Sequence, residues 1–67
     1  MKNNLEMFRN QKGLTQQELA DLVSVSRQTI ISLEGGRYNP SILLAFRLSK
    51  IFSTPIEDIF IYSDEEE

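Results

Sequence analysis

The stretch that decides the fold reads SVSRQTIISLEGG and spans residues 24–36. On a helix at about 100° per residue, Ile30 and Leu33 fall together with Ser26 on one side, where they form an ordinary core stripe. The other side carries a different set, which is Gln28, Ile31 and Ser32, flanked by Arg27. An isolated isoleucine therefore lies among hydrogen-bonding groups, where a surface helix normally carries Glu and Lys.

Start and stop signals around this stretch predict a mainly α chain of five short helices. The starts are near Asn4, at the Thr15–Glu18 capping box, at Ser26, after Asn39-Pro40-Ser41, and at a Thr54–Glu57 capping box with Pro55 as first helical residue. Gly13 and the pair Gly35-Gly36 end the first and third helices. The expected inner faces are Leu19, Ala20, Leu22 and Val23 on the second helix, and Leu44, Ala45, Leu48, Ile51 and Phe52 on the fourth.

The two ends of the chain predict a small sheet. Residues 59–63 (IFIYS) are β-branched and aromatic and favour a strand. Residues 1–4 are the only unassigned partner, so we expect a two-stranded antiparallel pair that joins the N- and C-terminal segments. The alternative is a frayed helix end with an apolar tail. One domain would then span residues 1–63, followed by an acidic, disordered tail over residues 64–67. We expect this tail only to keep the protein solvated; the alternatives are that it repels DNA or binds a metal ion.

Length and composition exclude several functions. A chain of 67 residues makes one domain that buries only about 60% of its unfolded surface, so a partner chain is plausible. The absence of Cys and His removes disulfides, the usual zinc ligands, the thiol nucleophile and the commonest general base. We therefore expect a cytoplasmic protein without cofactor or metal, and no enzyme activity. No 18-residue apolar run or signal core indicates a membrane span or export.

The net charge of −3 is divided unevenly along the chain. Residues 1–50 carry seven basic and four acidic side chains, for a charge of +3, whereas residues 51–67 carry six acidic and no basic ones, for −6. Exposed charges farther apart than a Debye length of about 8 Å are largely screened. The acidic end therefore says little about what the first fifty residues can bind.

The second and third helices predict a helix-turn-helix, because a tight connection joins two helices that are apolar on their inner faces. An αα corner that only packs would explain Ala20, Val25, Ile30 and Leu33, but not the outer face of the third helix. A helix that enters the major groove needs base-edge donors and acceptors and apolar contact for thymine methyls, which Arg27, Gln28, Ile31 and Ser32 supply. A solvated face with one stray isoleucine is the alternative.

Residues that could contact phosphates flank this face. The candidates at the two helix N-termini are Thr15, Gln16, Ser26 and Thr29, and those after the third helix are Arg37, Tyr38 and Asn39. Free amides and the positive dipole end at a helix N-terminus suit a phosphate. Capping and loop chemistry also favour these residue types.

The segment LTQQELADLVSVSRQTIISLEGGRYNPS resembles the helix-turn-helix of the Cro/C1 (phage-repressor, XRE-type) family. The likeness runs from Leu5 to Phe60 and is greatest to the small cytolysin repressor-like regulators, which carry similar SRQTI, YNPS and TPxEDIF segments. It implies a five-helix, lambda-repressor-like domain that acts as a homodimer on double-stranded DNA with a two-fold symmetric operator.

The resemblance also implies roles for single residues. Gln16 would contact a phosphate and brace the start of the recognition helix, and Arg9 and Glu34 would form a buried ion pair, unless both are ordinary surface residues. Ser24 departs from the family, which usually has Gly in the turn. A serine can adopt the left-handed conformation at a cost of about 1 kcal/mol.

Apolar residues exceed what one core requires. Ile42 and Phe46 lie beside the core stripe of the fourth helix, and Ile61 and Tyr62 follow the fifth helix. We expect a homodimer that buries them and sets two recognition helices about 34 Å apart. The predicted function is transcriptional regulation, most simply repression, with no evident small-molecule effector. The alternative is an antitoxin or protein-interaction module, in which the apolar patch is essential and the outer face of the third helix is dispensable.

Overall fold

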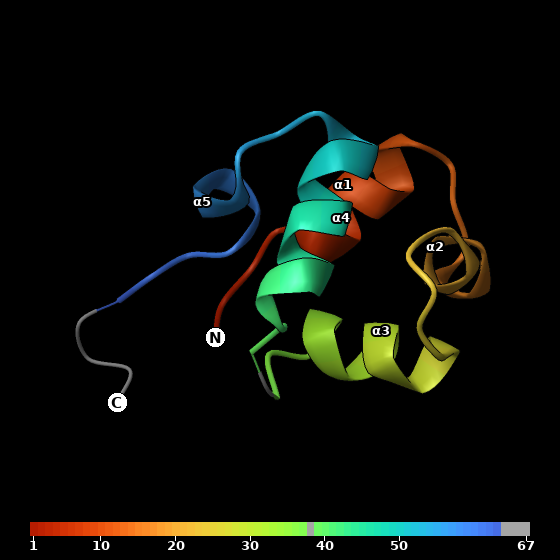
Figure 1. Ribbon diagram of the computed structural model, residues 1–67, viewed down its shortest axis with the longest axis horizontal. Coiled ribbons are helices and arrows are strands. Elements are labelled where there is room, and N and C mark those ends of the chain that lie inside the picture. The colour runs from red at the N-terminus through yellow and green to blue at the C-terminus, as the bar shows by residue number, and fades with distance from the viewer. Residues whose placement is uncertain (38, 64–67) are drawn as a thin grey trace.

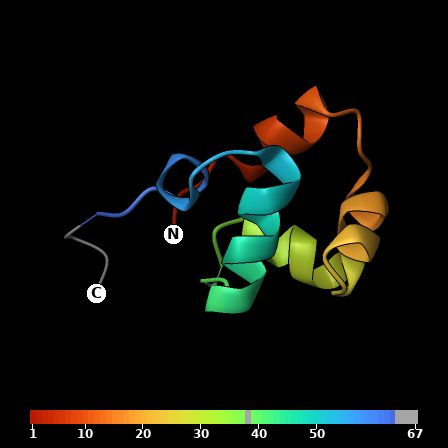
Figure 2. The same ribbon diagram turned by 45° about the horizontal axis from the view of Figure 1, so that its top comes forward.

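A computed structural model describes residues 1–37 and 39–63. These residues form five helices, α1 (Leu5–Gln11), α2 (Gln16–Leu22), α3 (Arg27–Glu34), α4 (Ile42–Phe52) and α5 (Ile56–Ile59). The predicted mainly α fold is therefore confirmed. Figures 1 and 2 show α2 on one side of α4, and α5 with the beginning of the chain on the other side. Over the described residues, no helix is long and apolar enough to cross a membrane.

The helix-turn-helix forms as its capping residues predict. The Thr15 hydroxyl accepts from the Glu18 amide at 3.0 Å, while the Glu18 carboxylate accepts from the Thr15 amide at 2.8 Å, which completes the capping box. Ser26 caps α3 by accepting from the amide of Thr29. Between the helices, Ser24 has φ 62°, the left-handed conformation expected where the family has glycine. Ser24 therefore supplies the left-handed residue of the short turn between Val23, the C-cap of α2, and Ser26, the N-cap of α3.

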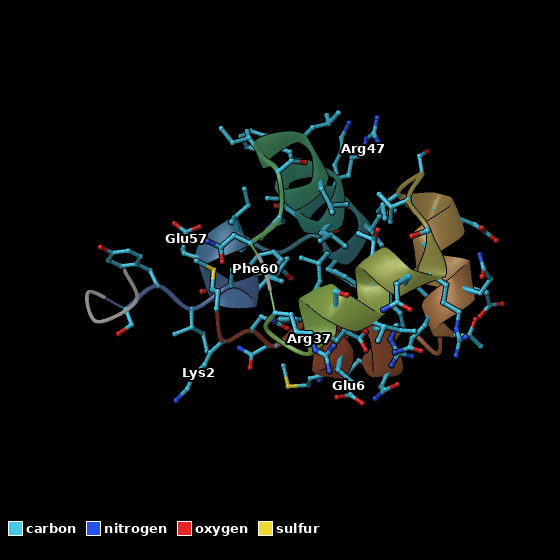
Figure 3. All side chains as sticks on the ribbon, turned by 90° about the horizontal axis from the view of Figure 1, so that it is seen from below. Lys2, Glu6, Arg37, Arg47, Glu57 and Phe60 are labelled. Atoms are coloured by element: carbon cyan, nitrogen blue, oxygen red, sulfur yellow. The ribbon has the colours of Figure 1, made fainter. Side chains whose placement is uncertain are left out.

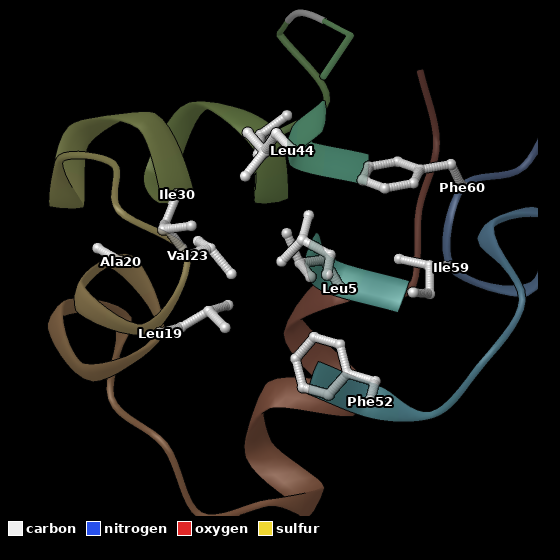
Figure 4. Close-up of a cluster of buried hydrophobic side chains, with 11 residues drawn as sticks. Leu5, Leu19, Ala20, Val23, Ile30, Leu44, Phe52, Ile59 and Phe60 are labelled. Atoms are coloured by element: carbon white, nitrogen blue, oxygen red, sulfur yellow. The ribbon is translucent and has the colours of Figure 1, made fainter. Parts of the chain in front are cut away.

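The core lies where α1, α3 and α4 meet, and α2 and α5 close its sides (Figure 4). Ala20 is fully buried, which is consistent with close approach of α2 to α3. Leu22 is a wrong prediction, because 54% of it is exposed. It lies about 100° from Val23 around the helix, and a helix of two turns can bury only one stripe. The fully buried large side chains are Leu5, Leu19, Val23, Ile30, Leu33, Leu48 and Ile59.

The two terminal segments pair through an isolated bridge, and no strand forms over residues 1–37 and 39–63. An antiparallel bridge joins Asn3 to Phe60, and the amide of Ile61 donates to the carbonyl of Lys2 at 2.9 Å. The predicted strand from residue 59 is wrong, because Ile59 ends α5 and is buried in the core. The amide of Phe60 still donates to the carbonyl of Ile56, so the bonds to the N-terminal segment begin only at the carbonyl of Ile59, the last residue of α5.

The predicted capping box of α5 is also wrong. Pro55 is the N-cap of α5, not its first helical residue, and no side chain caps the helix. The Thr54 hydroxyl instead donates backwards to the carbonyl of Phe52 at 2.7 Å, and Ser49 Oγ donates to the carbonyl of Thr54 at 2.6 Å. These bonds satisfy carbonyls around the end of α4, where Ser53 has φ 49°. The tail over residues 64–67 lies outside the described residues.

Candidate nucleic-acid interface

Helix α3 separates the side chains that hold it from those that are free to bind. Ile30 and Leu33 are fully buried against the core. On the opposite side, Arg27 and Gln28 are exposed, and Ile31 and Ser32 are half-buried. Figure 3 views the molecule from the side of α3 and shows Arg37 near the end of the helix. The four predicted base-reading residues therefore share one accessible helix face.

Gln28 and Ser32 are one turn apart on this face. Gln28 Nε2 lies 3.5 Å from Ser32 Oγ, a long contact that a better partner can replace. A carboxamide offers both a donor and an acceptor, and Arg27 offers a fork of donors. Together with the methyl groups of Ile31, the face carries the groups that major-groove readout requires.

Glu34 joins three helices at the end of α3. Arg9 Nε lies 2.6 Å from Glu34 Oε2, and Arg9 Nη2 lies 3.3 Å from Oε1. Both side chains are nearly inaccessible, and Arg9 Nη1 also donates to the carbonyl of Leu14 at 2.8 Å. The hydrogen bond to Glu34 raises the pKa of Arg9 above its ordinary value. The guanidinium therefore stays charged at all physiological pH values.

Gln16 occupies a different place from the one that the family resemblance implies. Gln16 Nε2 donates to Glu34 Oε1 at 3.1 Å, so the side chain braces the end of α3 rather than its start. The expected brace at the start of α3 is therefore replaced by one at its end, whereas the phosphate contact of Gln16 stays a prediction. Thr15, beside Gln16, is exposed and keeps a hydroxyl proton to donate.

The remaining predicted phosphate contacts divide into accessible and engaged groups. Arg37 and Asn39 are exposed on the segment that follows α3, whereas Tyr38 lies outside the described residues. Ser26 Oγ and Thr29 Oγ1 lie 3.0 Å apart and bond to each other. Ser26 is exposed and Thr29 is half-buried, so Ser26 is the more accessible of these two hydroxyls.

Two positioning contacts could not be predicted from the sequence. Arg47 of α4 donates from Nη1 to the carbonyl of Val23 at 3.1 Å and so places a cation at the C-terminal end of α2. Asn3, before α1, donates to the carbonyl of Leu33 at 2.7 Å. Both join segments that are distant in the chain, and a single sequence carries no local signal for such pairs. Among the described residues, no cluster of His, Cys, Asp or Glu could hold a metal ion.

These features define the class of protein. Helices α2 and α3 form a pair, and the outward face of the second helix, α3, carries polar and methyl groups. A turn with a left-handed serine and a buried ion pair hold α3 in place. This is the arrangement of a helix-turn-helix DNA-binding domain, in which the second helix enters the major groove.

Comparison with known proteins agrees with this class. The family model described as helix-turn-helix matches residues 5–59. An HTH-type transcriptional regulator of Methanocaldococcus jannaschii is 54% identical over 66 residues, which cover 98% of this chain and 100% of the relative. The HTH-type transcriptional regulator YgzD of Bacillus subtilis is 42% identical over 65 residues, which cover 97% of this chain and 98% of YgzD. The chain therefore belongs to the helix-turn-helix family of DNA-binding transcriptional regulators.

A solved structure supports the same conclusion. The clp gene regulator ClgR from Corynebacterium glutamicum matches with a TM-score of 0.72 and 33% sequence identity. The match covers 81% of this chain and 57% of the ClgR chain. The similarity therefore concerns the domain fold, and the remaining part of the ClgR chain lies outside the match.

Proposed function

We propose that the protein is a sequence-specific repressor that binds an inverted-repeat operator as a homodimer in the cytoplasm. The outward face of α3 is the single observation that carries the sequence-specific part. Arg27, Gln28, Ile31 and Ser32 are accessible, while the core is completed by Ile30 and Leu33 of the same helix. The surplus of basic side chains over residues 1–50 supports binding to a polyanion.

An apolar groove supports the homodimer. It has a volume of about 550 Å³ and is lined by Ile42 and Phe46 of α4 and by Phe60 and Tyr62 of the C-terminal segment, among others. Ile42 is 77% exposed and Tyr62 is 74% exposed, and Ile61 beside them is also exposed. Large apolar side chains gathered on one face usually mark an interface. A second copy of the same face is the simplest cover, because C2 pairing needs only self-complementarity.

Repression is the simplest regulatory outcome of such a dimer. Two copies of α3, held about 34 Å apart, would read two half-sites one turn of B-DNA apart. A protein that occupies this site excludes other proteins from it without any catalytic step. We accordingly propose no enzyme activity and no effector.

The competing function is a protein-interaction module or antitoxin. It would use the apolar groove on a different polypeptide and would leave the α3 face without a role. The choice of residues on that face favours DNA, because interaction through the groove alone gives no reason for Arg27 and Gln28 to lie beside a partly accessible isoleucine, Ile31.

Selection of bound duplexes from a random DNA pool tests the proposal. The expected result is an inverted repeat, with affinity that falls steeply as salt rises, because phosphate contacts release counterions. Sedimentation of the free protein and of the complex would report one dimer per operator. Equal, weak binding of all duplexes, or a selected motif without two-fold symmetry, would contradict the proposal.

A further inference from the structure

We propose that Asn3 is a positioning residue that ties the recognition helix to the dimer surface and thereby sets the half-site spacing that the protein accepts. This inference rests on the proposed function, because spacing has meaning only for a dimer on an inverted repeat. It adds a role for a residue outside the helix-turn-helix, on the N-terminal segment whose Met1 lines the apolar groove.

The side chain of Asn3 uses both ends of its carboxamide. Asn3 Nδ2 donates to the carbonyl of Leu33 at 2.7 Å, in the last turn of α3. Asn3 Oδ1 accepts from the amide of Leu5 at 3.0 Å, at the first turn of α1. The carbonyl of Leu33 also accepts from the amide of Gly36 at 3.0 Å, so Asn3 supplies a second donor to a carbonyl in the last turn of α3. One rigid amide thus joins the end of α3 to the start of α1.

The backbone at Asn3 continues the connection to the other end of the chain. Asn3 forms the antiparallel bridge with Phe60, and the flanking bonds run from the Ile61 amide to the Lys2 carbonyl and from the Asn4 amide to the Ile59 carbonyl at 2.8 Å. Figure 4 shows the segment before α1 running beside Ile59 and Phe60. The bridge therefore ends next to Ile61 and Tyr62, which we assign to the dimer surface.

A continuous set of hydrogen bonds consequently links the reading helix to the proposed interface. It runs from the carbonyl of Leu33, through the side chain and backbone of Asn3, to Phe60 and Ile61. The Glu34 cluster fixes the same end of α3 to α1 and α2, but none of its bonds reaches the C-terminal segment. The amino group of Met1 adds a bond to the carbonyl of Gly36 at 3.0 Å, just after α3. The orientation of α3 relative to the interface therefore depends on Asn3, on this bond and on core packing, and Asn3 provides the link to the last turn of the helix itself.

Half-site spacing is the quantity that this orientation controls. In a two-fold dimer, a change in the angle between α3 and the interface moves both recognition helices symmetrically. The preferred centre-to-centre distance of the half-sites changes with it. A looser connection would let one dimer bind operators of several spacings, while base reading within each half-site would stay the same.

The test compares Asn3→Ala and Asn3→Asp with a matched control, Asn4→Ala. Aspartate keeps the acceptor for the Leu5 amide but loses the Nδ2 donor, which bonds the carbonyl of Leu33 at 2.7 Å and that of Met1 at 3.4 Å. It therefore removes the bond to α3 while the bond to α1 stays. Asn4 is the neighbouring amide, and its Nδ2 donates to the carbonyl of Asp58 at 3.2 Å without reaching α3. Each full-length variant is titrated with the selected operator and with versions whose half-sites are one base pair closer or farther apart.

For both Asn3 variants, the preference for the selected spacing should fall by roughly threefold to tenfold, the equilibrium worth of one hydrogen bond. Discrimination against a single base change within a half-site should stay at the wild-type value, and Asn4→Ala should behave as the wild type. Equal loss of affinity at all spacings, or an unchanged spacing preference, would overturn the inference alone. Asn3→Asp decides the question if Asn3→Ala does not fold. A wild-type protein that selects no inverted repeat would overturn the proposed function as well.

Discussion

Glu34 holds Arg9 through both of its carboxylate oxygens, with only 7% of the Glu34 side chain exposed. The same carboxylate accepts from Gln16, so one acidic side chain at the end of α3 anchors α1 and α2 as well. A buried charge is stable only if its partners satisfy it, and here every side-chain polar atom that is fully buried among the described residues has a partner.

Replacing Glu34 should destabilise the domain severely. Glu34→Ala leaves the buried guanidinium of Arg9 without its counter-charge, which costs about 3–5 kcal/mol in comparable sites. Urea denaturation monitored by circular dichroism measures the loss. The matched control is Asp21→Ala, whose carboxylate accepts from Gln17 at 2.9 Å on the exposed side of α2 and should cost less than about 0.5 kcal/mol. Equal effects of the two variants would show that the buried pair has no special role.

Ser24→Gly should stabilise the protein. At φ 62° the serine adopts a left-handed conformation that costs about 1 kcal/mol and that glycine adopts freely. After the added chain entropy of glycine is subtracted, the net gain is up to about 0.5 kcal/mol. The melting temperature should rise by a few degrees. Gly13→Ala gives the reciprocal test, since Gly13 has φ +70° with open space around it, and should cost about 1 kcal/mol. A lower melting temperature for Ser24→Gly would contradict the argument.

Changes on the α3 face should separate base reading from phosphate binding. Arg27→Ala and Gln28→Ala should each lower the preference for the selected base by about 1–3 kcal/mol, and leave binding to unrelated duplexes nearly unchanged. Arg37→Ala should instead weaken binding to all sequences and reduce the salt slope by about one unit. Anisotropy titrations at several salt concentrations measure both quantities. A uniform effect from Arg27 or Gln28 would assign them to the phosphate backbone.

Charges placed in the apolar groove should prevent dimer formation. Phe46→Asp and Tyr62→Asp should each raise the dimer dissociation constant roughly 30-fold or more, as expected for a central apolar contact of about 2 kcal/mol. Sedimentation equilibrium measures this change. Leu43→Asp is the control, because Leu43 lies on the same helix, is 59% exposed as Phe46 is, and does not line the groove. Monomer formation by the control alone would move the interface to the Leu43 side of α4.

The features that the sequence predicts correctly are those fixed by local chemistry. Thr15 and Ser26 cap α2 and α3, and Gly13 takes the left-handed conformation, because each needs only its immediate neighbours. The apolar stripe of α3 follows from its period alone. These local rules determine which face of α3 is turned outward.

The incorrect predictions concern residues that have two possible hydrogen-bond partners or conformations. The sequence alone does not show which of the two is the more stable. The Thr54 hydroxyl could accept from an amide of α5 or donate to a carbonyl of α4. It donates to the carbonyl of Phe52, and α5 has no side-chain cap. Ile59 has strand propensity, but burial in the core holds it in the last turn of α5. The family resemblance places Gln16 at the start of α3, but its side chain bonds Glu34 at the end of α3. The sequence does not show that Glu34 lies within reach of Gln16.

The division of α3 into a holding side and an open side has an evolutionary consequence. Ile30 and Leu33 keep the helix in the core, and none of the four outer residues is buried, since Arg27 and Gln28 are exposed and Ile31 and Ser32 are half-buried. Substitutions there can therefore accumulate with little loss of stability, and duplicated copies of such a gene could acquire new target sites while keeping the same scaffold. A library randomised at residues 27, 28, 31 and 32 should consist mainly of folded proteins that differ in the DNA they prefer.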